Sequence, residues 1–359
     1  MALNQVGLER LNTATTDKIG TNKNIIINGS MQVAQRGTSS TSTGFGSVDR
    51  FQISYSGTDE APTQAQASVA SGTTPFETGL SKAFKITNGD QSGGAGATDH
   101  IQTIYTIEDQ DLATSGWNYT SSSSYVTLSF YIKSSIAQNF YFYLQSDNGS
   151  QFRYVMETGS LSADTWTKIT KTIPGNSNIV LNSDNGVGMY LVYSLFDGTD
   201  RTGTRPLNAW AALDNTSRTP DQTATWYTTN NSTLEITGVQ LEVGSVATDF
   251  EHRSFTEELQ LCKRYFQAQR PYYNAAQYLI TNEVASNTVF FNPEMRATPT
   301  ATHETLSCRE NTDGFVNVSV SSNYLLDSKG INYVVTKTGA ATSDSFIIFV
   351  NNAEYDAEL

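Results

Sequence analysis

The stretch that decides the fold is Tyr125-Val126-Thr127-Leu128-Ser129-Phe130-Tyr131-Ile132-Lys133. Apolar side chains stand at every second position, so one face of the extended chain is apolar and the other is mixed. This alternation is typical of a strand with one side against a hydrophobic core. The apolar face comprises Val126, Leu128, Phe130 and Ile132.

The same period continues beyond this strand. Residues 140–144 alternate again, with Tyr141 and Tyr143 on the face opposite to the apolar side chains. The turn-forming residues 146–149 follow, and residues 152–156 resume the alternation. Two alternating runs joined by a short Asn-Gly loop predict a β-hairpin.

About ten runs of this kind precede residue 252, with no helical period between them. We therefore expect an all-β fold with a jelly-roll β-sandwich over residues 24–252. Its first strand is expected at residues 25–27, ended by the turn dipeptide Asn28-Gly29. Four further alternating runs predict a smaller antiparallel β domain over residues 270–359.

The charge balance limits the kind of partner. The chain has 22 basic and 35 acidic residues, a formal net charge of −13. Phosphate backbones and anionic membranes repel such a chain, so we expect no nucleic-acid partner and no membrane insertion. The start Met1-Ala2-Leu3-Asn4-Gln5 lacks the basic and apolar regions of a signal peptide. Cys262 and Cys308 are expected to be reduced thiols, because two cysteines do not make a disulfide framework.

The period changes after residue 252. Ser254 followed by Glu257 is a capping box, which predicts the start of a helix. This connecting helix is expected within residues 253–269, with a length of about 14 residues and an end at Pro271. Two interpretations stay open: the helix packs on its own sandwich, or it packs against sister chains. In the second, the candidates for trimer contact are Phe255, Leu259, Cys262 and Phe266.

No spacing typical of a metal or catalytic site is present. His100, His252 and His303 are scattered, and there is no Cys-x-x-Cys pair and no Gly-x-Ser-x-Gly elbow. We therefore expect no cofactor and no enzymatic activity. Structural calcium stays open, because the acidic loops 147–149 and 197–200 offer oxygen ligands, although the same residue types are ordinary turn formers.

Aromatic residues in polar loops suggest the binding of sugars. Flat rings stack on the C–H faces of a sugar, and neighbouring polar side chains bond its hydroxyls. The alternative for each ring is packing on the rim of the sandwich. The candidates for glycan contact are Trp117, Tyr119, Trp210, Trp226, Tyr227, Tyr272 and Tyr273.

Several blocks of sequence resemble a group of bacteriophage tail-fibre and virion proteins. The entry block covers residues 24–37 and is followed by Val48-Asp49-Arg50-Phe51. The most specific block begins at Ile236-Thr237-Gly238-Val239-Gln240-Leu241-Glu242-Val243 and continues to residue 266 as a final jelly-roll strand leading into a short helix. Shorter similarities are found at residues 1–5, where the match is to phages of marine bacteria, and at residues 293–300 and 357–359.

The resemblance implies a carbohydrate-binding-module-like jelly roll with a C-terminal β domain, usually a homotrimer on the virion. Residues 1–23, a docking peptide or a frayed terminus by their composition, would then attach the chain to phage tail or adaptor proteins. The body would adsorb to host surface polysaccharide through several weak sites at once. The expected location is the virion tail, after assembly in the host cytoplasm. Two alternatives stay open: a capsid or tail decoration protein without a receptor role, and a glycan depolymerase or esterase.

Overall fold

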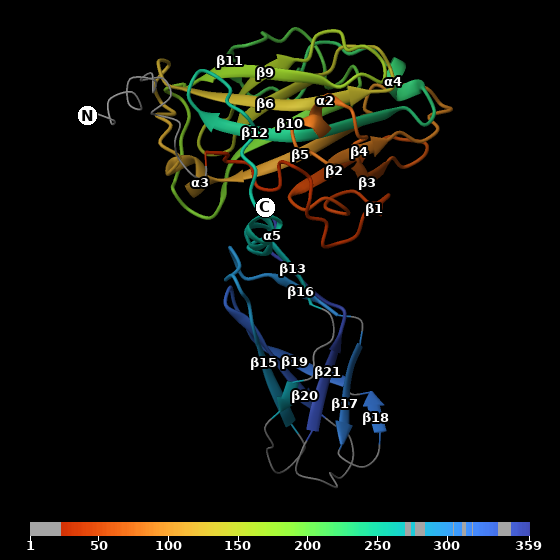
Figure 1. Cartoon of the computed structure of the whole chain (residues 1–359), viewed down its shortest axis with the longest axis vertical. Helices are drawn as coiled ribbons and strands as arrows, with labels where there is room; N and C mark the ends of the chain where they lie inside the picture. Colours follow the sequence, from red (N-terminus) through yellow and green to blue (C-terminus); the bar gives the residue numbers. More distant parts are fainter. Residues whose placement is uncertain are drawn as a thin grey trace, which may run out of the picture.

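The computed structural model describes residues 23–269, 274–276, 284–303, 305–310, 314–317, 319–336 and 346–359. A β-sandwich comes first along the chain, and an elongated set of strands extends away from it (Figure 1). Of the predicted N-terminal segment 1–23, all but Lys23 lies outside the described residues.

The sandwich consists of two six-stranded antiparallel sheets. The first sheet has the order β1 (Ser39–Ser40), β3 (Thr63–Ser68), β4 (Lys82–Thr87), β12 (Thr233–Val243), β6 (Tyr125–Ser134) and β9 (Thr167–Pro174). The second sheet has the order β11 (Trp210–Ala212), β8 (Phe152–Glu157), β7 (Tyr141–Ser146), β10 (Val187–Asp197), β5 (His100–Glu108) and β2 (Phe51–Ser56). Consecutive strands such as β6 and β7 lie in different sheets, and the predicted all-β jelly roll is confirmed.

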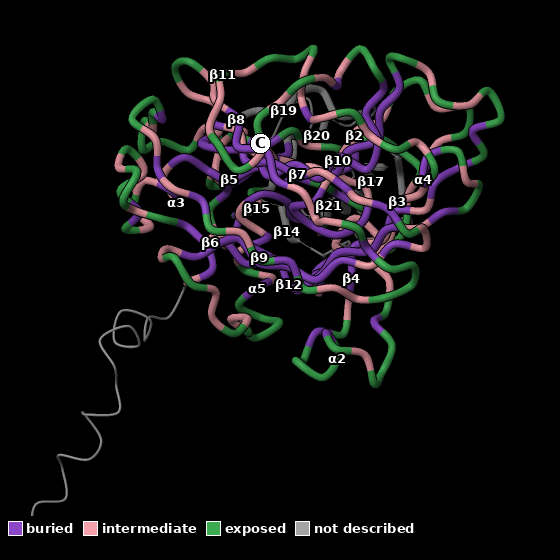
Figure 2. The backbone as a smooth tube through the Cα atoms, turned by 90° about the horizontal axis from the view of Figure 1, so that it is seen from above, coloured by how far each residue is buried: buried purple, intermediate pink, exposed green. Residues whose placement is uncertain are grey.

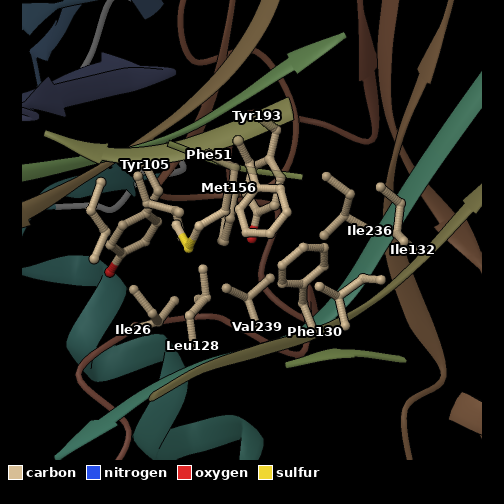
Figure 3. Close-up of a cluster of buried hydrophobic side chains, with 14 of the residues drawn as sticks. Ile26, Phe51, Tyr105, Leu128, Phe130, Ile132, Met156, Tyr193, Ile236 and Val239 are labelled. Atoms are coloured by element: carbon tan, nitrogen blue, oxygen red, sulfur yellow. The ribbon is translucent and has the colours of Figure 1, made fainter. Parts of the chain in front are cut away.

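The core between the sheets is built from the alternating residues that the sequence indicates. Val126, Leu128 and Phe130 of β6 are fully buried. The Phe130 ring meets the rings of Phe142 and Tyr193 edge-on, each with 5.0 Å between centroids. Figure 3 shows Phe130 and Tyr193 within the core. Burial of one such side chain stabilises the fold by about 1.5–3 kcal/mol. The predicted hairpin is also present, since β7 and β8 pair antiparallel from Tyr141–Glu157 to Gln145–Arg153.

The first predicted strand is wrong. Residues 25–27 are irregular, and the backbone N–H of Ile26 donates to the side-chain oxygen of Asn24. The same oxygen accepts from the backbone of Leu241, so an amide side chain takes the place of a strand ladder. The Asn28-Gly29 turn is confirmed, with Asn28 at φ 60° in the left-handed region.

Helix α5 (Phe255–Lys263) begins as predicted, because the Ser254 hydroxyl accepts from the backbone N–H of Glu257. It is shorter than expected and ends well before Pro271. The cause is pairing: Phe266 opposes Asp356, so the chain enters strand β13 (Phe266–Gln269) instead of another helical turn. The remaining helices are short: α2 (Thr74–Glu77), α3 (Asp109–Ala113) and α4 (Thr225–Thr228). No helix in the described part of the chain is long and apolar enough to cross a membrane.

The C-terminal strands form three small antiparallel sheets. The predicted smaller β domain is confirmed as a fold class, with more strands than the four runs indicated. The sheets are β13–β22 (Ala353–Asp356)–β16 (Thr300–Thr302); β14 (Asn274–Ala276)–β21 (Phe346–Asn351)–β17 (Thr305–Glu310)–β18 (Gly314–Asn317); and β15 (Val284–Phe290)–β20 (Gly330–Thr336)–β19 (Ser319–Leu326).

Charged contacts join these strands to the sandwich. Arg36 pairs with Asp356 at 2.8 Å and Arg264 pairs with buried Glu108 at 2.7 Å. The Tyr265 hydroxyl donates to the same Glu108 carboxylate at 2.6 Å. The junction therefore uses specific hydrogen bonds as well as apolar packing, and it fixes where strand β13 leaves the sandwich.

Candidate functional site

Three of the aromatic candidates for glycan contact are buried, which corrects their assignment. Trp226 and Tyr227 of α4 and Trp117 near α3 belong to the core between the sheets. The Trp226 indole donates to the carbonyl of Thr233 at 3.0 Å, and the Tyr227 ring stacks on Phe196 at 4.2 Å. A ring whose faces are packed has no face for a sugar, so these residues stabilise the sandwich.

The other candidates are not gathered into one site. Trp210 is half-buried at the sandwich edge, where its indole donates to the Pro174 carbonyl at 2.7 Å and so links the two sheets. Tyr119 is half-buried against the edge of Trp117. Helices α3 and α4 lie at opposite ends of the sandwich (Figure 2), so the aromatic groups near them are far apart. Tyr272 and Tyr273 lie outside the described residues.

A better arranged surface is the outer face of the second sheet, the face turned away from the core. Cross-strand pairing from β8 through β7 and β10 to β5 places side chains in three rows. The apolar row is Val155, Tyr143, Val192 and Ile104. The first polar row is Glu157, Tyr141, Ser194 and Gln102. The second polar row is Arg153, Gln145, Tyr190 and Thr106.

Strand geometry sets the size of this three-row platform. Adjacent strands are about 4.8 Å apart and alternate residues of one strand about 7 Å apart, so the platform measures roughly 14 by 14 Å. Tyr141, Tyr190 and Ile104 are half-buried and reach the surface. The other members of the apolar row are buried. The platform therefore offers two phenol rings and one aliphatic side chain among hydrogen-bonding neighbours.

The connection of residues 198–224, which is mostly loop but includes strand β11, runs over part of the platform. Leu207 packs against the apolar row, and the Asn208 backbone N–H donates to the Val155 carbonyl at 2.8 Å. The Gln222 amide donates to the Ser194 hydroxyl at 2.6 Å. The loop thus borders the platform and brings its own polar side chains to it.

Arginine side chains lie at the platform although the chain as a whole is acidic. The Arg153 guanidinium lies over the Tyr143 ring at 4.3 Å. Burial raises the pKa of Asp197, whose carboxylate accepts hydrogen bonds from Gln102 and Ser194. Burial and the nearby Arg201 and Arg218 lower the pKa of His100 to about 4, so that this imidazole is neutral at physiological pH.

Sequence reasoning missed this platform although a signal was present. The alternation of residues 140–144 assigns Tyr141 and Tyr143 to the face opposite the core. A tyrosine on the outer face of a strand exposes apolar ring surface to water, and exposed apolar patches mark binding sites.

Cavities are also found elsewhere among the described residues. One, of about 660 Å³, lies between the sandwich and strand β22, lined among others by Arg36, Phe45, Phe266 and Asp356. Another, of about 340 Å³, lies on the outer face of the first sheet beside Tyr131, Phe250 and His252.

Neither acidic loop is arranged as a cation site. The Asp197 carboxylate is engaged by Gln102 and Ser194, and the Asp147 side chain accepts from Gln151 at 2.9 Å. Within the described ranges, no group of three His, Cys, Asp or Glu side chains is placed to hold a metal ion. The binding of structural calcium stays a prediction, and the described residues offer no cluster of acidic side chains to hold it.

The candidates for trimer contact divide into two kinds. Cys262 and Phe266 are buried within the chain itself, which corrects their assignment. Cys262 packs against Ile27 of the sandwich, and the Phe266 ring lies under the Arg36 guanidinium at 3.6 Å. Leu259 is half-buried in the same cluster as Cys262, and Phe255 is 54% exposed. The helix therefore packs on its own sandwich, and Phe255 is exposed.

Comparison with known proteins gives structural likenesses only. No family model matches the chain, and no curated protein matches it. The enzymatically active domain of tailspike protein 4 of bacteriophage CBA120 is similar over 62% of the chain, with 12% identity and a TM-score of 0.34, and the match spans 22% of that domain's chain.

Two carbohydrate-binding structures are similar to part of the chain. A CBM4 structure matches 60% of the chain and 98% of its own, with 14% identity and a TM-score of 0.31. The N-terminal cellulose-binding domain of Cellulomonas fimi β-1,4-glucanase C matches 60% and 99%, with 9% identity and a TM-score of 0.28. The jelly-roll assignment stands on the strand order and register of this chain.

Proposed function

We propose that this chain is a phage virion structural protein, a tail fibre that adsorbs to host cell-surface glycans through the three-row platform. The observation that carries the proposal is the row pattern itself. An apolar row crosses four strands between two rows of hydrogen-bonding side chains, and Tyr141 and Tyr190 stand half-exposed on either side of it.

This pattern suits a sugar chain because a sugar ring has the same two-part character. Its C–H faces are apolar and bind aromatic or aliphatic side chains, whereas its hydroxyls need donors and acceptors around the rim. Among the polar rows, Gln145 and Glu157 are half-buried like the two tyrosines and supply donors and acceptors, whereas Gln102 and Ser194 are buried and bonded to Asp197. Rigid strands hold these groups in place, which reduces the entropy lost on binding.

The role on the virion rests on the sequence resemblance. In this proposal residues 1–23 attach the chain to tail or adaptor proteins, and three copies form the fibre. A single shallow site binds weakly, but simultaneous binding by several copies raises the overall affinity by a factor of about 10²–10⁴. The proposed action is binding without cleavage of the glycan.

An immobilised array of neutral and acidic oligosaccharides tests the binding step. We expect the full chain to bind at least one class of glycan, and the variants Tyr141→Ala and Tyr190→Ala to bind about tenfold more weakly or worse. Tyr125→Ala is the matched control, because Tyr125 is 36% exposed on β6 of the other sheet. Equal binding by all three variants would place the site elsewhere.

Two further readouts separate the alternatives. A decoration protein without a receptor role binds no glycan on the array and does not compete with phage for host cells. A depolymerase releases new reducing ends from the polysaccharide, whereas a fibre that only binds leaves the polymer length unchanged. Both measurements use the same purified chain.

A further inference from the structure

Four arginines converge on the platform and its bordering loop. Arg153 belongs to β8, and the loop of residues 198–224 contributes Arg201, Arg205 and Arg218. The backbone N–H of Arg218 donates to the carbonyl of Arg201 at 2.7 Å, which brings these two residues side by side. We call these four residues the arginine cluster.

The hydrogen bonds that the side chains of Arg153, Arg201 and Arg205 donate all go to neutral groups. Arg153 is only 2% exposed, and it donates to the Gln145 amide oxygen at 2.6 and 3.1 Å and to the Asp214 backbone carbonyl. Arg201 donates to the Thr98 carbonyl and Arg205 to the Ala211 carbonyl. The Nε atoms of Arg205 and Arg218 are buried without a hydrogen-bond partner.

The ion pairs of the described residues are made by other basic groups. Their cations are Arg36, Arg50, Lys133, Arg253 and Arg264. A buried cation without a counter-ion is costly, and burial accordingly lowers the pKa of Arg153 and of Arg205. The described part of the chain thus leaves the arginine cluster without a carboxylate at ion-pair distance.

The acidic residues nearby have neutral partners of their own. Asp197 accepts from Gln102 and Ser194, Asp221 accepts from Thr202, and Asp214 accepts from Thr216. Asp197 still interacts electrostatically with Arg201 and Arg218, and Asp214 with Arg205, but none of these pairs is a direct ion pair. Arg201, Arg205 and Arg218 are half-buried, so part of each remains open to a ligand.

We propose that the glycan bound at the platform is anionic, and that its carboxylate or sulfate groups bind the arginine cluster. This inference rests on the proposed function and names its substrate class. A planar guanidinium binds a carboxylate or a sulfate through two parallel hydrogen bonds, which a neutral sugar hydroxyl does not match. In this proposal the half-exposed Ile104, Tyr141 and Tyr190 contact the sugar ring, and the arginines select its charge.

Paired polymers separate the two anionic groups. Dextran sulfate is compared with dextran, and alginate with its carboxyl-reduced form, by titration calorimetry on the full chain. We expect the anionic member of at least one pair to bind at least about tenfold more tightly than its neutral counterpart. This preference is expected to decrease as the salt concentration is raised from about 0.05 to about 0.5 M, because salt screens the interaction between charges. The net charge of −13 disfavours non-specific attraction of polyanions.

Charge-removing variants locate the effect. We expect Arg218→Gln and Arg205→Gln to lose most of the preference for the anionic polymer, and Arg218→Lys to keep part of it. Lys168→Gln removes the same charge from β9 on the other sheet and serves as the control. Thermal unfolding of each variant verifies that the fold is retained.

The outcomes distinguish this inference from the proposed function. Equal binding of charged and neutral polymers by the wild type, unchanged in the arginine variants, would overturn the anionic preference and leave glycan binding intact. A preference that Lys168→Gln reduces as much as Arg218→Gln does would also overturn it. Absence of binding to every polymer and to the oligosaccharide array would overturn the proposed function itself.

Discussion

The carboxylate of Glu358 pairs with the buried guanidinium of Arg50, 308 positions earlier in the sequence. Arg50 also lies over the Tyr265 ring at 3.4 Å and donates to the Thr106 carbonyl at 2.7 Å. Its side chain is 1% exposed. A single cation therefore joins the C-terminal strands, the end of α5 and strand β5.

Removal of the Glu358 charge is expected to destabilise this junction. Glu358→Gln leaves Arg50 buried without its counter-ion, and the loss of one partner of a buried pair costs about 3–5 kcal/mol. Urea unfolding measures the change in free energy. Glu354→Gln is the control, since Glu354 is exposed on the neighbouring strand β22. Equal stability of the two variants would show that the fold does not depend on Glu358 as the counter-ion of Arg50.

The core prediction concerns the ring cluster of Phe130. Phe130→Ala removes a fully buried side chain that contacts Phe142 and Tyr193, so a loss of about 3–5 kcal/mol is expected. The same substitution at Phe76, which is 37% exposed on α2, is expected to cost less than about 1 kcal/mol. Thermal and urea unfolding measure both. Similar losses at the two positions would contradict the packing described here.

The free energy of unfolding is expected to depend on pH through the carboxyl group of Asp49. Burial raises the pKa of its carboxyl from 3.8 to about 6, against the opposing hydrogen bonds from Gln35. The folded protein then holds this proton more tightly than the unfolded chain does. The stability that Asp49 contributes is therefore fully present below about pH 4 and is lost as the pH rises through about 6.

The measurement compares the wild type with Asp49→Asn at several pH values. The free energy of unfolding of the wild type relative to the variant is expected to fall by up to about 3 kcal/mol between pH 4 and pH 7. His100, whose pKa is lowered to about 4, contributes with the opposite sign, but it does so in both proteins. A difference that stays constant with pH would show that Asp49 titrates near its ordinary value.

The exposed face of α5 gives a prediction on assembly. We expect light scattering to report three times the chain mass of 39.2 kDa, as closed threefold symmetry requires. Phe255→Asp places a charge on the exposed ring position of α5 and is expected to shift the mass toward one chain, whereas Phe76→Asp on α2 is not. A wild type of single-chain mass would contradict the trimer.

Much of the sandwich could be predicted because one physical signal, alternation, marks half-buried strands. Strand β6 follows this rule, with Val126, Leu128 and Phe130 all buried. Residues 25–27 show where the rule fails: three isoleucines have strand propensity, but the Asn24 side chain supplies the backbone partners. Propensity alone contains no information about a side chain that replaces a strand.

The end of α5 and the site show a second limit of sequence reasoning. The apolar stripe from Phe255 to Phe266 fits a helix, yet Phe266 pairs with Asp356, a partner 90 residues away that no local pattern reveals. The platform likewise depends on register. Tyr143 lies beside Val155 and Val192 only because three strands align, so its neighbours follow from tertiary structure.

Strands β13 and β22 lie next to each other, so the chain leaves the sandwich and returns to it at the same place (Figure 1). Leu359 then packs with α5 in the cluster that contains Cys262. Among the described residues, the sheets β14–β21–β17–β18 and β15–β20–β19 are formed only by strands that lie between these two in the sequence, so they are attached like an insertion with its entry and exit on adjacent strands. We therefore expect this position to accept segments of different length and shape with little effect on the sandwich that holds them.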